Sequence, residues 1–197
     1  MISWTLMAVR SQMSIISETK TRSDTILIIK MEVLEATNKR KSIRNYKNIP
    51  ISKEKIKQII DAGIKAPSGK NGQPWKVIVV QDDKCLLAQL ANLTVFRGFV
   101  RKADCLIIVF MDTSISYNHD KDMQAMGAFI ENMLLTATDL GLGACWVGEI
   151  TNRAKEIKNI LQIKNEYELI AFITIGVPED NELIKDKTYK DPIEKWL

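Results

Sequence analysis

The chain alternates between two patterns of hydrophobic and polar positions. In five stretches apolar residues recur every three or four positions, as on the buried face of a helix. The first of these stretches starts at Met31, and the others cover 52–65, 86–93, 122–140 and 152–161. Between them lie short apolar runs at 75–80, 105–111, 144–147 and 169–176, which predict strands. The alternation predicts an α/β or α+β sandwich, with helices on the faces of a buried sheet of about four strands.

Capping residues set the expected helix ends. Ser52 is expected to cap the helix that ends near Lys65, because its hydroxyl can accept a hydrogen bond from a first-turn N–H. Gly141 follows the longest helical pattern, and glycine is favoured directly after a helix. Thr151 or Asn152 is expected to cap the last helix.

Residues 1–30 do not share this pattern. Apolar side chains stand there among Ser and Thr, and the run 25–29 has no partner pattern. We hypothesise that Met31 is the natural start and that 1–30 is an extension that is not native or is disordered. This leaves 31–197 as the single expected domain. The intact mass of natively expressed protein tests the hypothesis, and a dominant species that begins at Met1 would refute it.

Length and composition exclude several classes of protein. The 197 residues suffice for one domain, and 46% apolar with 26% charged residues is ordinary for a globular chain. The longest apolar run, 105–111, is far shorter than the roughly 20 residues of a membrane-spanning helix. The 28 basic and 24 acidic residues are scattered and form no basic stripe. We therefore expect neither a membrane nor a nucleic acid as a partner.

Cysteine and histidine content narrows the chemistry further. Cys85, Cys105 and Cys145 are odd in number and widely spaced, so neither a disulfide framework nor a zinc site is expected. Free thiols suit the reducing cytoplasm, where we expect the protein to act. The single histidine, His119, disfavours metal sites and hydrolytic triads.

Basic and hydroxyl side chains are concentrated in 40–44, Arg-Lys-Ser-Ile-Arg. Residues two apart in an extended stretch project to the same side, so Arg40, Ser42 and Arg44 would present two guanidinium groups and a hydroxyl to one point. Arginine binds phosphate oxygens through paired, charge-assisted hydrogen bonds, and serine adds a neutral donor. The segment suits a phosphate group, although taken alone a solvated basic stretch is the simpler interpretation.

A second candidate is the loop 66–75, Ala-Pro-Ser-Gly-Lys-Asn-Gly-Gln-Pro-Trp, between a predicted helix and a predicted strand. Ser68, Asn71 and Gln73 supply hydroxyl and amide groups that can bind the edge of a heterocycle. An ordinary turn is the alternative, because Pro-Ser-Gly and Asn-Gly are common turn formers.

A third candidate is 141–149, Gly-Leu-Gly-Ala-Cys-Trp-Val-Gly-Glu. Gly148 lacks a side chain, so a flat ligand could approach the backbone N–H groups there. The segment is not a dinucleotide fingerprint, because the third glycine is missing and the Gly-x-Gly follows a helix. Cys145 is expected to be a buried structural thiol.

Taken together and in order, these segments resemble the FMN-dependent nitroreductase family. The shared pattern is Arg-x-Ser-x-Arg, then Ala-Pro-Ser-x-x-Asn-x-Gln-Pro-Trp, a long helix ending in Gly-Leu-Gly-x-Cys-Trp, and Ile-Gly-x-Pro near the end. The resemblance runs from about residue 31 to residue 196. It implies an α+β fold, a three-layer α/β/α sandwich with a central, mostly antiparallel sheet. It also implies a homodimer that holds FMN non-covalently at the subunit interface.

The resemblance also implies site residues. The segment with Arg40, Lys41, Ser42 and Arg44 corresponds to the part of the family that binds the FMN phosphate, ribityl chain and ring edge. The loop contributed by the other subunit corresponds to Pro67, Ser68, Gly69 and Asn71. The turn beside the reactive flavin nitrogen corresponds to Val147 and Gly148. Lys190, two positions before Pro192, stands where the family commonly has arginine, and it lacks that residue's bidentate fork.

The activity implied by the resemblance needs no acid or base from the protein, which agrees with the single histidine. NADH or NADPH would reduce FMN, and two electrons would then pass by a ping-pong mechanism to a small acceptor such as a nitroaromatic compound or a quinone. Related proteins also carry out dehalogenation, azoline oxidation or flavin fragmentation. A non-catalytic FMN-binding or redox-sensing module is the alternative of another class.

Overall fold

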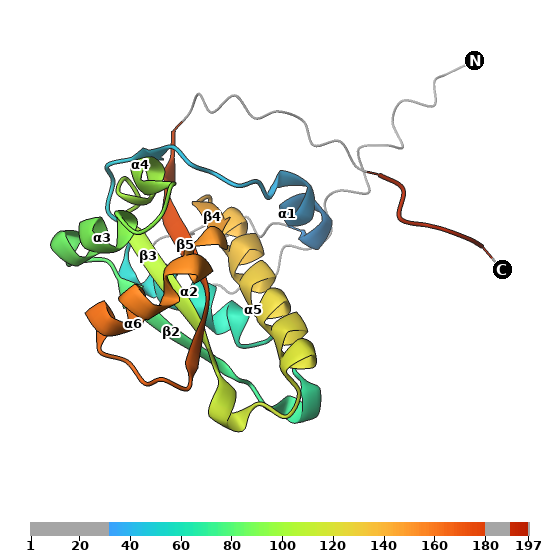
Figure 1. Ribbon diagram of the computed structural model, residues 1–197. Helices are drawn as coiled ribbons and strands as arrows, with labels where there is room; N and C mark the ends of the chain where they lie inside the picture. Colours follow the sequence, from blue (N-terminus) through green and yellow to red (C-terminus); the bar gives the residue numbers. More distant parts are fainter. Residues whose placement is uncertain (1–31, 180–189, 197) are drawn as a thin grey trace, which may run out of the picture. The chain divides into compact units, whose positions relative to one another are not determined.

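The computed structural model describes residues 32–179 and 190–196. Its helices are α1 (Val33–Lys39), α2 (Lys53–Gly63), α3 (Lys84–Ala91), α4 (Arg97–Val100), α5 (His119–Asp139) and α6 (Ala154–Leu161). Its strands are β1 (Tyr46–Lys47), β2 (Trp75–Val80), β3 (Cys105–Asp112), β4 (Gly143–Val147) and β5 (Tyr167–Pro178). Helices and strands alternate in the described chain as the hydrophobic pattern predicts, except that two helices, α3 and α4, lie between β2 and β3 (Figure 1). The hypothesis about 1–30 lies outside the described residues.

All strand pairs in the sheet are antiparallel, and β5 is its central strand. One edge of β5 pairs with β3, which in turn pairs with β2. The other edge of β5 pairs with β4, from Gly143 opposite Gly176 to Val147 opposite Phe172, and further along with β1. In the described chain β2 and β4 therefore lie on opposite sides of the β5–β3 pair.

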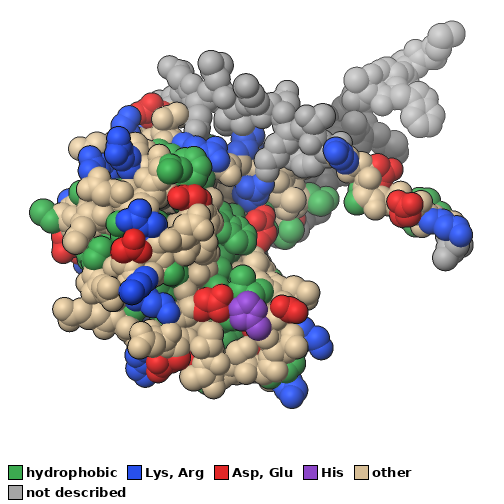
Figure 2. Space-filling view, in the orientation of Figure 1, with side chains coloured by type: hydrophobic (Ala, Val, Ile, Leu, Met, Phe, Trp, Pro, Cys, Tyr) green, Lys and Arg blue, Asp and Glu red, His purple; other side chains and the backbone are tan. Residues whose placement is uncertain are grey.

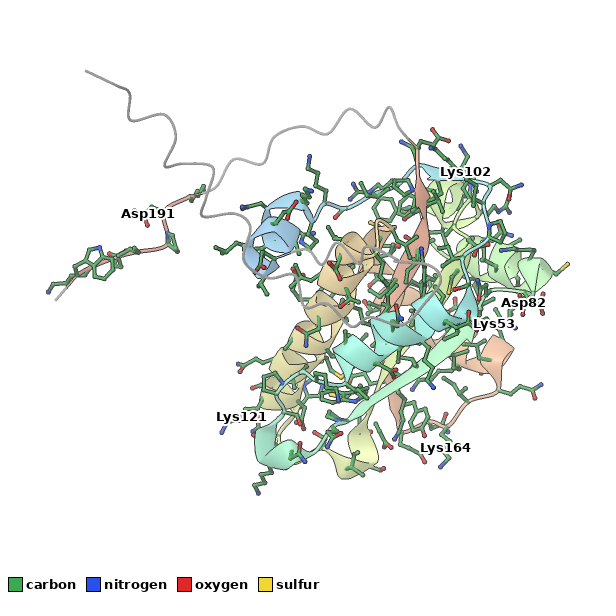
Figure 3. The ribbon with its side chains drawn as sticks, turned by 180° about the vertical axis from the view of Figure 1, so that it is seen from behind. Lys53, Asp82, Lys102, Lys121, Lys164 and Asp191 are labelled. Carbon is green, nitrogen blue, oxygen red and sulfur yellow. The ribbon has the colours of Figure 1, made fainter. Side chains whose placement is uncertain are left out.

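Helices cover both faces of this sheet. Successive residues of β3 contribute to two different hydrophobic clusters, because side chains alternate between the faces of a strand. Ile107 and Val109 pack with α2 and α5, whereas Ile108 and Phe110 pack with α3 and α6. Figure 1 views the sheet from the side of α6, and Figure 3, from behind, shows α2 in front of it. The three-layer α+β sandwich with a mostly antiparallel sheet is thus confirmed.

The predicted helix starts are partly right. Ser52 caps α2, and its side chain accepts a hydrogen bond from the N–H of Lys55. The longest helix starts three residues earlier than predicted, at His119, because the Asn118 side chain accepts from the N–H of Lys121. The predicted cap at Thr151 or Asn152 is wrong, since both residues lie in the 3₁₀ helix η4 (Glu149–Arg153) that precedes α6.

The hydrophobic pattern does not predict the shortest elements. Helix α4 spans four residues and β1 spans two, so neither is long enough to show a periodicity. Both depend on tertiary contacts: Val100 of α4 is fully buried, and Tyr46 of β1 is 4% exposed. None of the helices in 32–179 and 190–196 is long and apolar enough to cross a membrane.

Candidate functional site

The basic segment lies along the outer edge of β4. Ser42 forms a parallel bridge with Ala144, and the N–H of Ile43 donates to the carbonyl of Ala144 at 2.9 Å. Lys41, Ser42 and Ile43 are half-buried, and Arg44 is exposed. The first and third candidate segments, about a hundred residues apart in sequence, are therefore hydrogen-bonded neighbours in the fold.

The two arginines of this segment do not converge on one point, contrary to the prediction from an extended chain. Arg40 follows α1 directly, and its Nε lies 3.2 Å from Oε1 of Glu131 on α5. The guanidinium carbon of Arg44 lies 5.8 Å from the ring centroid of Phe99 in α4, and its Nη1 donates to the carbonyl of Ser42 at 3.3 Å. The reason is that only Ser42 bridges to β4, so the segment does not continue as a regular strand.

The turn after β4 is open to a ligand. Val147, the last residue of β4, is 2% exposed, and Gly148 after it is exposed. A Cβ added to Gly148 would meet no heavy atom closer than Nε1 of Trp146, at 3.6 Å. Trp146 itself points outward and is 40% exposed, unlike the rest of β4. A planar group can therefore reach the backbone of Gly148 with the indole of Trp146 beside it.

A hydrogen bond fixes this turn to the loop between α3 and α4. The hydroxyl of Thr94, 3% exposed, donates to Oε2 of Glu149 at 2.8 Å and accepts from the N–H of Phe96 at 3.1 Å. Sequence reasoning missed this contact, as it missed the position of Phe99 below Arg44. No local signal marks either one, because each joins segments that are far apart in the sequence.

The loop before β2 has an unusual backbone. Lys70, Asn71 and Gln73 adopt left-handed φ angles of 53°, 56° and 48°. Such conformations cost energy in residues other than glycine and are found preferentially at functional sites. The hydroxyl of Ser68 accepts from the N–H of Gln73 at 3.1 Å and so closes the loop.

Contacts with a neighbouring side chain also restrict which residues the loop can contain. A Cβ at Gly69 would lie 2.1 Å from the hydroxyl oxygen of Tyr117, so only glycine fits there without movement. Pro67 and Asn71 are exposed. The exposed side of the loop is therefore available to a neighbouring molecule.

Within one chain the loop and the basic segment lie apart. The loop leads into β2, and the basic segment lies along β4, with β5 and β3 between these two strands. Three strand spacings correspond to roughly 14 Å across the sheet. Lys190 is exposed in the segment 190–196, and its assignment to the site stays a prediction.

Other reactive side chains are structural. Burial raises the pKa of the Cys105 thiol to about 12, which makes this thiol a poor nucleophile. Cys145 is 2% exposed, as expected for a structural thiol. His119, the single histidine, lies at the surface (Figure 2). Its Nε2 lies 2.9 Å from Oε2 of Glu168, and the hydrogen bond between them raises the pKa of the imidazole. No group of three His, Cys, Asp or Glu side chains in the described ranges could hold a metal ion.

A separate cavity of about 650 Å³ lies between α2 and β2, away from the basic segment. Its walls include Ile56, Ile60 and Ile78. Lys53 and Asp82, whose charged atoms lie 2.7 Å apart, also line it (Figure 3). This ion pair and its hydrogen bond raise the pKa of Lys53 and lower the pKa of Asp82.

The fold and the basic segment beside an open glycine turn define an α+β protein of the nitroreductase class. A model of the nitroreductase family matches residues 37–95 and 91–177. The chain therefore belongs to the nitroreductase family.

Relatives of similar length support this membership. A protein of Archaeoglobus fulgidus that is named as an NADH dehydrogenase/NAD(P)H nitroreductase is 34% identical to this chain. The alignment covers 84% of this chain and 99% of the relative. A protein of the same name from Methanothermobacter thermautotrophicus is 32% identical, over 86% of this chain and 90% of the relative. A crystal structure of a nitroreductase-class protein from Desulfovibrio desulfuricans, in complex with FMN, is 38% identical with a TM-score of 0.75. That alignment covers 82% of this chain and 97% of the crystallised chain.

Proposed function

We propose that the protein is an FMN-dependent oxidoreductase that takes two electrons from NADH or NADPH and passes them to a small acceptor such as a nitroaromatic compound or a quinone. The observation that carries the proposal is the hydrogen bond between Ile43 and Ala144, which lays the basic segment along β4, the strand that Gly148 follows directly. Side chains that can bind a phosphate and a turn that a planar ring can approach thus lie on the same edge of the sheet. The FMN complex of the Desulfovibrio desulfuricans relative and the names of the archaeal relatives support the same conclusion.

The residues present fit FMN. Arg40, Lys41, Ser42 and Arg44 supply charged and neutral donors suited to a phosphate, a polyol chain and the carbonyl edge of a ring. The exposed Gly148, directly after the buried Val147, leaves room for a flat ring system at the backbone. Lys190 would add a further positive charge to the phosphate. When it is bound, FMN supplies the two-electron chemistry, and the chain supplies binding, orientation and exclusion of water.

We propose that a second copy of the chain completes each site. The loop with Pro67, Ser68, Gly69 and Asn71 exposes Pro67 and Asn71 and has a left-handed backbone at Asn71, yet it lies at the far edge of the sheet from Arg44. A homodimer in which this loop reaches the basic segment of its partner would unite the two halves. The dimer interface would then bury part of the cofactor and exclude solvent from it.

We further propose that 31–197 is the FMN-binding domain and that the protein acts in the cytoplasm. All three cysteines are free thiols, which suits a reducing compartment. The small-molecule acceptor would enter at the open side of Gly148.

The first experiment is the visible absorption spectrum of the full-length protein purified without added cofactor. Denaturation and identification of the released yellow compound follow. Stoichiometric FMN, with NADH or NADPH oxidation that depends on an added quinone or nitroaromatic compound, is the expected result. FMN without such oxidation would favour a non-catalytic binding module, and activity only with a halogenated acceptor would favour dehalogenation. A colourless protein that does not take up added FMN would refute the proposal.

A further inference from the structure

Two buried hydroxyl groups lie directly beneath the basic segment. Tyr46 is 4% exposed and Thr174 is fully buried in β5. The Tyr46 hydroxyl lies 2.6 Å from the carbonyl oxygen of Ile43 and 2.7 Å from Oγ1 of Thr174. Oγ1 of Thr174 lies 3.4 Å from the carbonyl oxygen of Cys145 in β4. These contacts join the basic segment, β5 and β4 at one point.

The proton positions follow from the acceptors. A carbonyl oxygen can only accept, so the single proton of the Tyr46 hydroxyl is committed to Ile43. The Tyr46 oxygen then accepts from Thr174 at 2.7 Å, the shorter of the two contacts that Thr174 makes. The backbone at Ile43 is thus held on both sides, with its N–H on Ala144 and its carbonyl on Tyr46.

A pair of glycines lets the segment lie this close to the sheet. Gly143 of β4 and Gly176 of β5 are directly opposite each other in the antiparallel register. A Cβ at Gly143 would lie 2.5 Å from Cγ2 of Ile43, and a Cβ at Gly176 would lie 2.4 Å from Cδ1 of Tyr46. Because these two glycines have no side chains, Ile43 and Tyr46 pack directly against the backbone of the sheet.

We infer that Tyr46 and Thr174 are positioning residues for FMN. They act through the backbone of Ile43, which carries Ser42 on one side and Arg44 on the other. Thr174 stands directly opposite Cys145 in the pairing of β5 with β4, three residues before Gly148. The pair therefore fixes the two halves of the candidate site against each other, and it does so without contacting the cofactor. The inference rests on the proposed function, because it assumes that these segments bind FMN.

A hydroxyl is needed at both positions for this role. Phenylalanine at 46 would keep the ring that packs on Gly176 but would leave the Ile43 carbonyl without this donor. Valine at 174 would keep the shape of threonine but would remove the proton that Tyr46 accepts. Each substitution would remove one buried hydrogen bond. Without it the basic segment could move, and its donor groups would no longer be held in one position for FMN.

The test compares full-length variants in their affinity for FMN, measured by quenching of FMN fluorescence well below the melting temperature. We expect Tyr46→Phe and Thr174→Val each to weaken FMN binding about five- to tenfold. Thr174→Ser keeps the hydroxyl and should stay within about twofold of the wild type. Tyr167→Phe, at the opposite end of β5, is the matched control and should leave the affinity unchanged. The melting temperature of each variant is recorded without FMN.

The outcomes separate the possible roles. A lower melting temperature with unchanged FMN affinity in Tyr46→Phe and Thr174→Val would overturn the inference, because the pair would then be purely structural. Equal losses in Thr174→Ser and Thr174→Val would also overturn it. If Tyr46→Phe does not fold, the two Thr174 variants decide. A wild-type protein that binds no FMN would overturn the proposed function and this inference with it, whereas tight wild-type binding with unaffected variants would overturn the inference alone.

Discussion

The Thr94 hydroxyl donates to Oε2 of Glu149 across 55 residues of sequence, at 2.8 Å. Thr94 also accepts from the N–H of Phe96, so one buried hydroxyl holds both the α3–α4 loop and the turn after β4. The turn starts at Gly148, where the candidate site is open. This hydrogen bond therefore limits how far the open edge of the site can move.

Replacing Thr94 with valine should destabilise the protein by about 1–2 kcal/mol, since the variant keeps the shape but leaves the half-buried Glu149 carboxylate without this donor. Urea unfolding of the full-length protein measures the change. Thr37→Val is the control, because Thr37 is exposed on α1 and bonds only within the helix, to Val33. Its effect should stay below about 0.5 kcal/mol. Equal effects in the two variants would contradict the role of the Thr94 contact.

Gly143→Ala should cost about 1–3 kcal/mol of stability, because the added methyl group would meet Ile43 at 2.5 Å in a region without spare volume. Gly98→Ala is the opposite case. Nothing lies within 4 Å of a Cβ at Gly98 in α4, and alanine is the better helix former, so stability should stay the same or rise by up to about 1 kcal/mol. Thermal melts of both variants measure the difference. A Gly143→Ala protein as stable as the wild type would show that Ile43 does not pack on Gly143.

Removing the Arg44 guanidinium should lower the reduction potential of bound FMN. A positive donor near the pyrimidine edge of the ring stabilises the anionic reduced form, and a charge-assisted hydrogen bond corresponds to about 30 mV or more for a two-electron couple. Spectroelectrochemical titration of Arg44→Ala measures the shift. Arg101→Ala removes the same charge from an exposed position after α4 and should leave the potential unchanged. An unchanged potential in Arg44→Ala would refute this role.

The sequence predicts the elements that have a long pattern and fails where tertiary contacts decide. Strand β2 has the predicted bounds, and β3 exceeds its predicted length by only Asp112. The first run is apolar except for Lys76 and the second is wholly apolar, and such short runs leave few alternatives. By contrast, β1 and α4 exist because Tyr46 and Val100 pack into the core.

The candidate site shows the same division. The spacing predicts that Arg40 and Arg44 point to the same place. In the structure, however, Arg40 contacts Glu131 of α5, whereas Arg44 contacts Phe99 of α4. Neither partner is adjacent in sequence, so no local pattern could predict their pairing. The order of the motifs predicts the family correctly because motif order does not depend on these side-chain directions.

The ion pair between His119 and Glu168 should make stability depend on pH. The hydrogen bond that the imidazole donates to the Glu168 carboxylate raises the pKa of His119 above its ordinary value of 6.5. The folded state therefore binds this proton more tightly, so the contribution is complete below pH 6.5 and is lost as pH rises through the higher folded pKa. Because both side chains are exposed, we expect a change of at most a few degrees in melting temperature.

Glu168→Gln checks this expectation. Its melting temperature should fall below that of the wild type at pH 5.5 and should match it at pH 9. Glu166→Gln is the control, because it removes the same charge two residues away, from a carboxylate whose partner is a lysine, Lys164, and not a histidine. A deficit in Glu168→Gln that is the same at both pH values would contradict the role of His119.

Mixing two inactive variants tests whether a second chain completes the site. We expect Arg44→Ala and Asn71→Ala each to lose most of their FMN-dependent activity. If one chain supplies Arg44 and its partner supplies Asn71, a heterodimer of the two variants carries one doubly altered site and one intact site. Random reassociation makes half of the dimers mixed, so about a quarter of the wild-type activity should return.

The control and the contrary result follow from the same geometry. If Arg44 and Asn71 acted within one chain, every site of a mixed dimer would still carry one substitution, and mixing would restore nothing. Mixing Arg40→Ala with Arg44→Ala is the control, because both residues lie in the same segment and no combination produces an intact site. Recovery of activity in the first mixture alone would place the exposed loop 67–71 of one chain against the basic segment of the other, since the two lie about three strand spacings apart within a single chain.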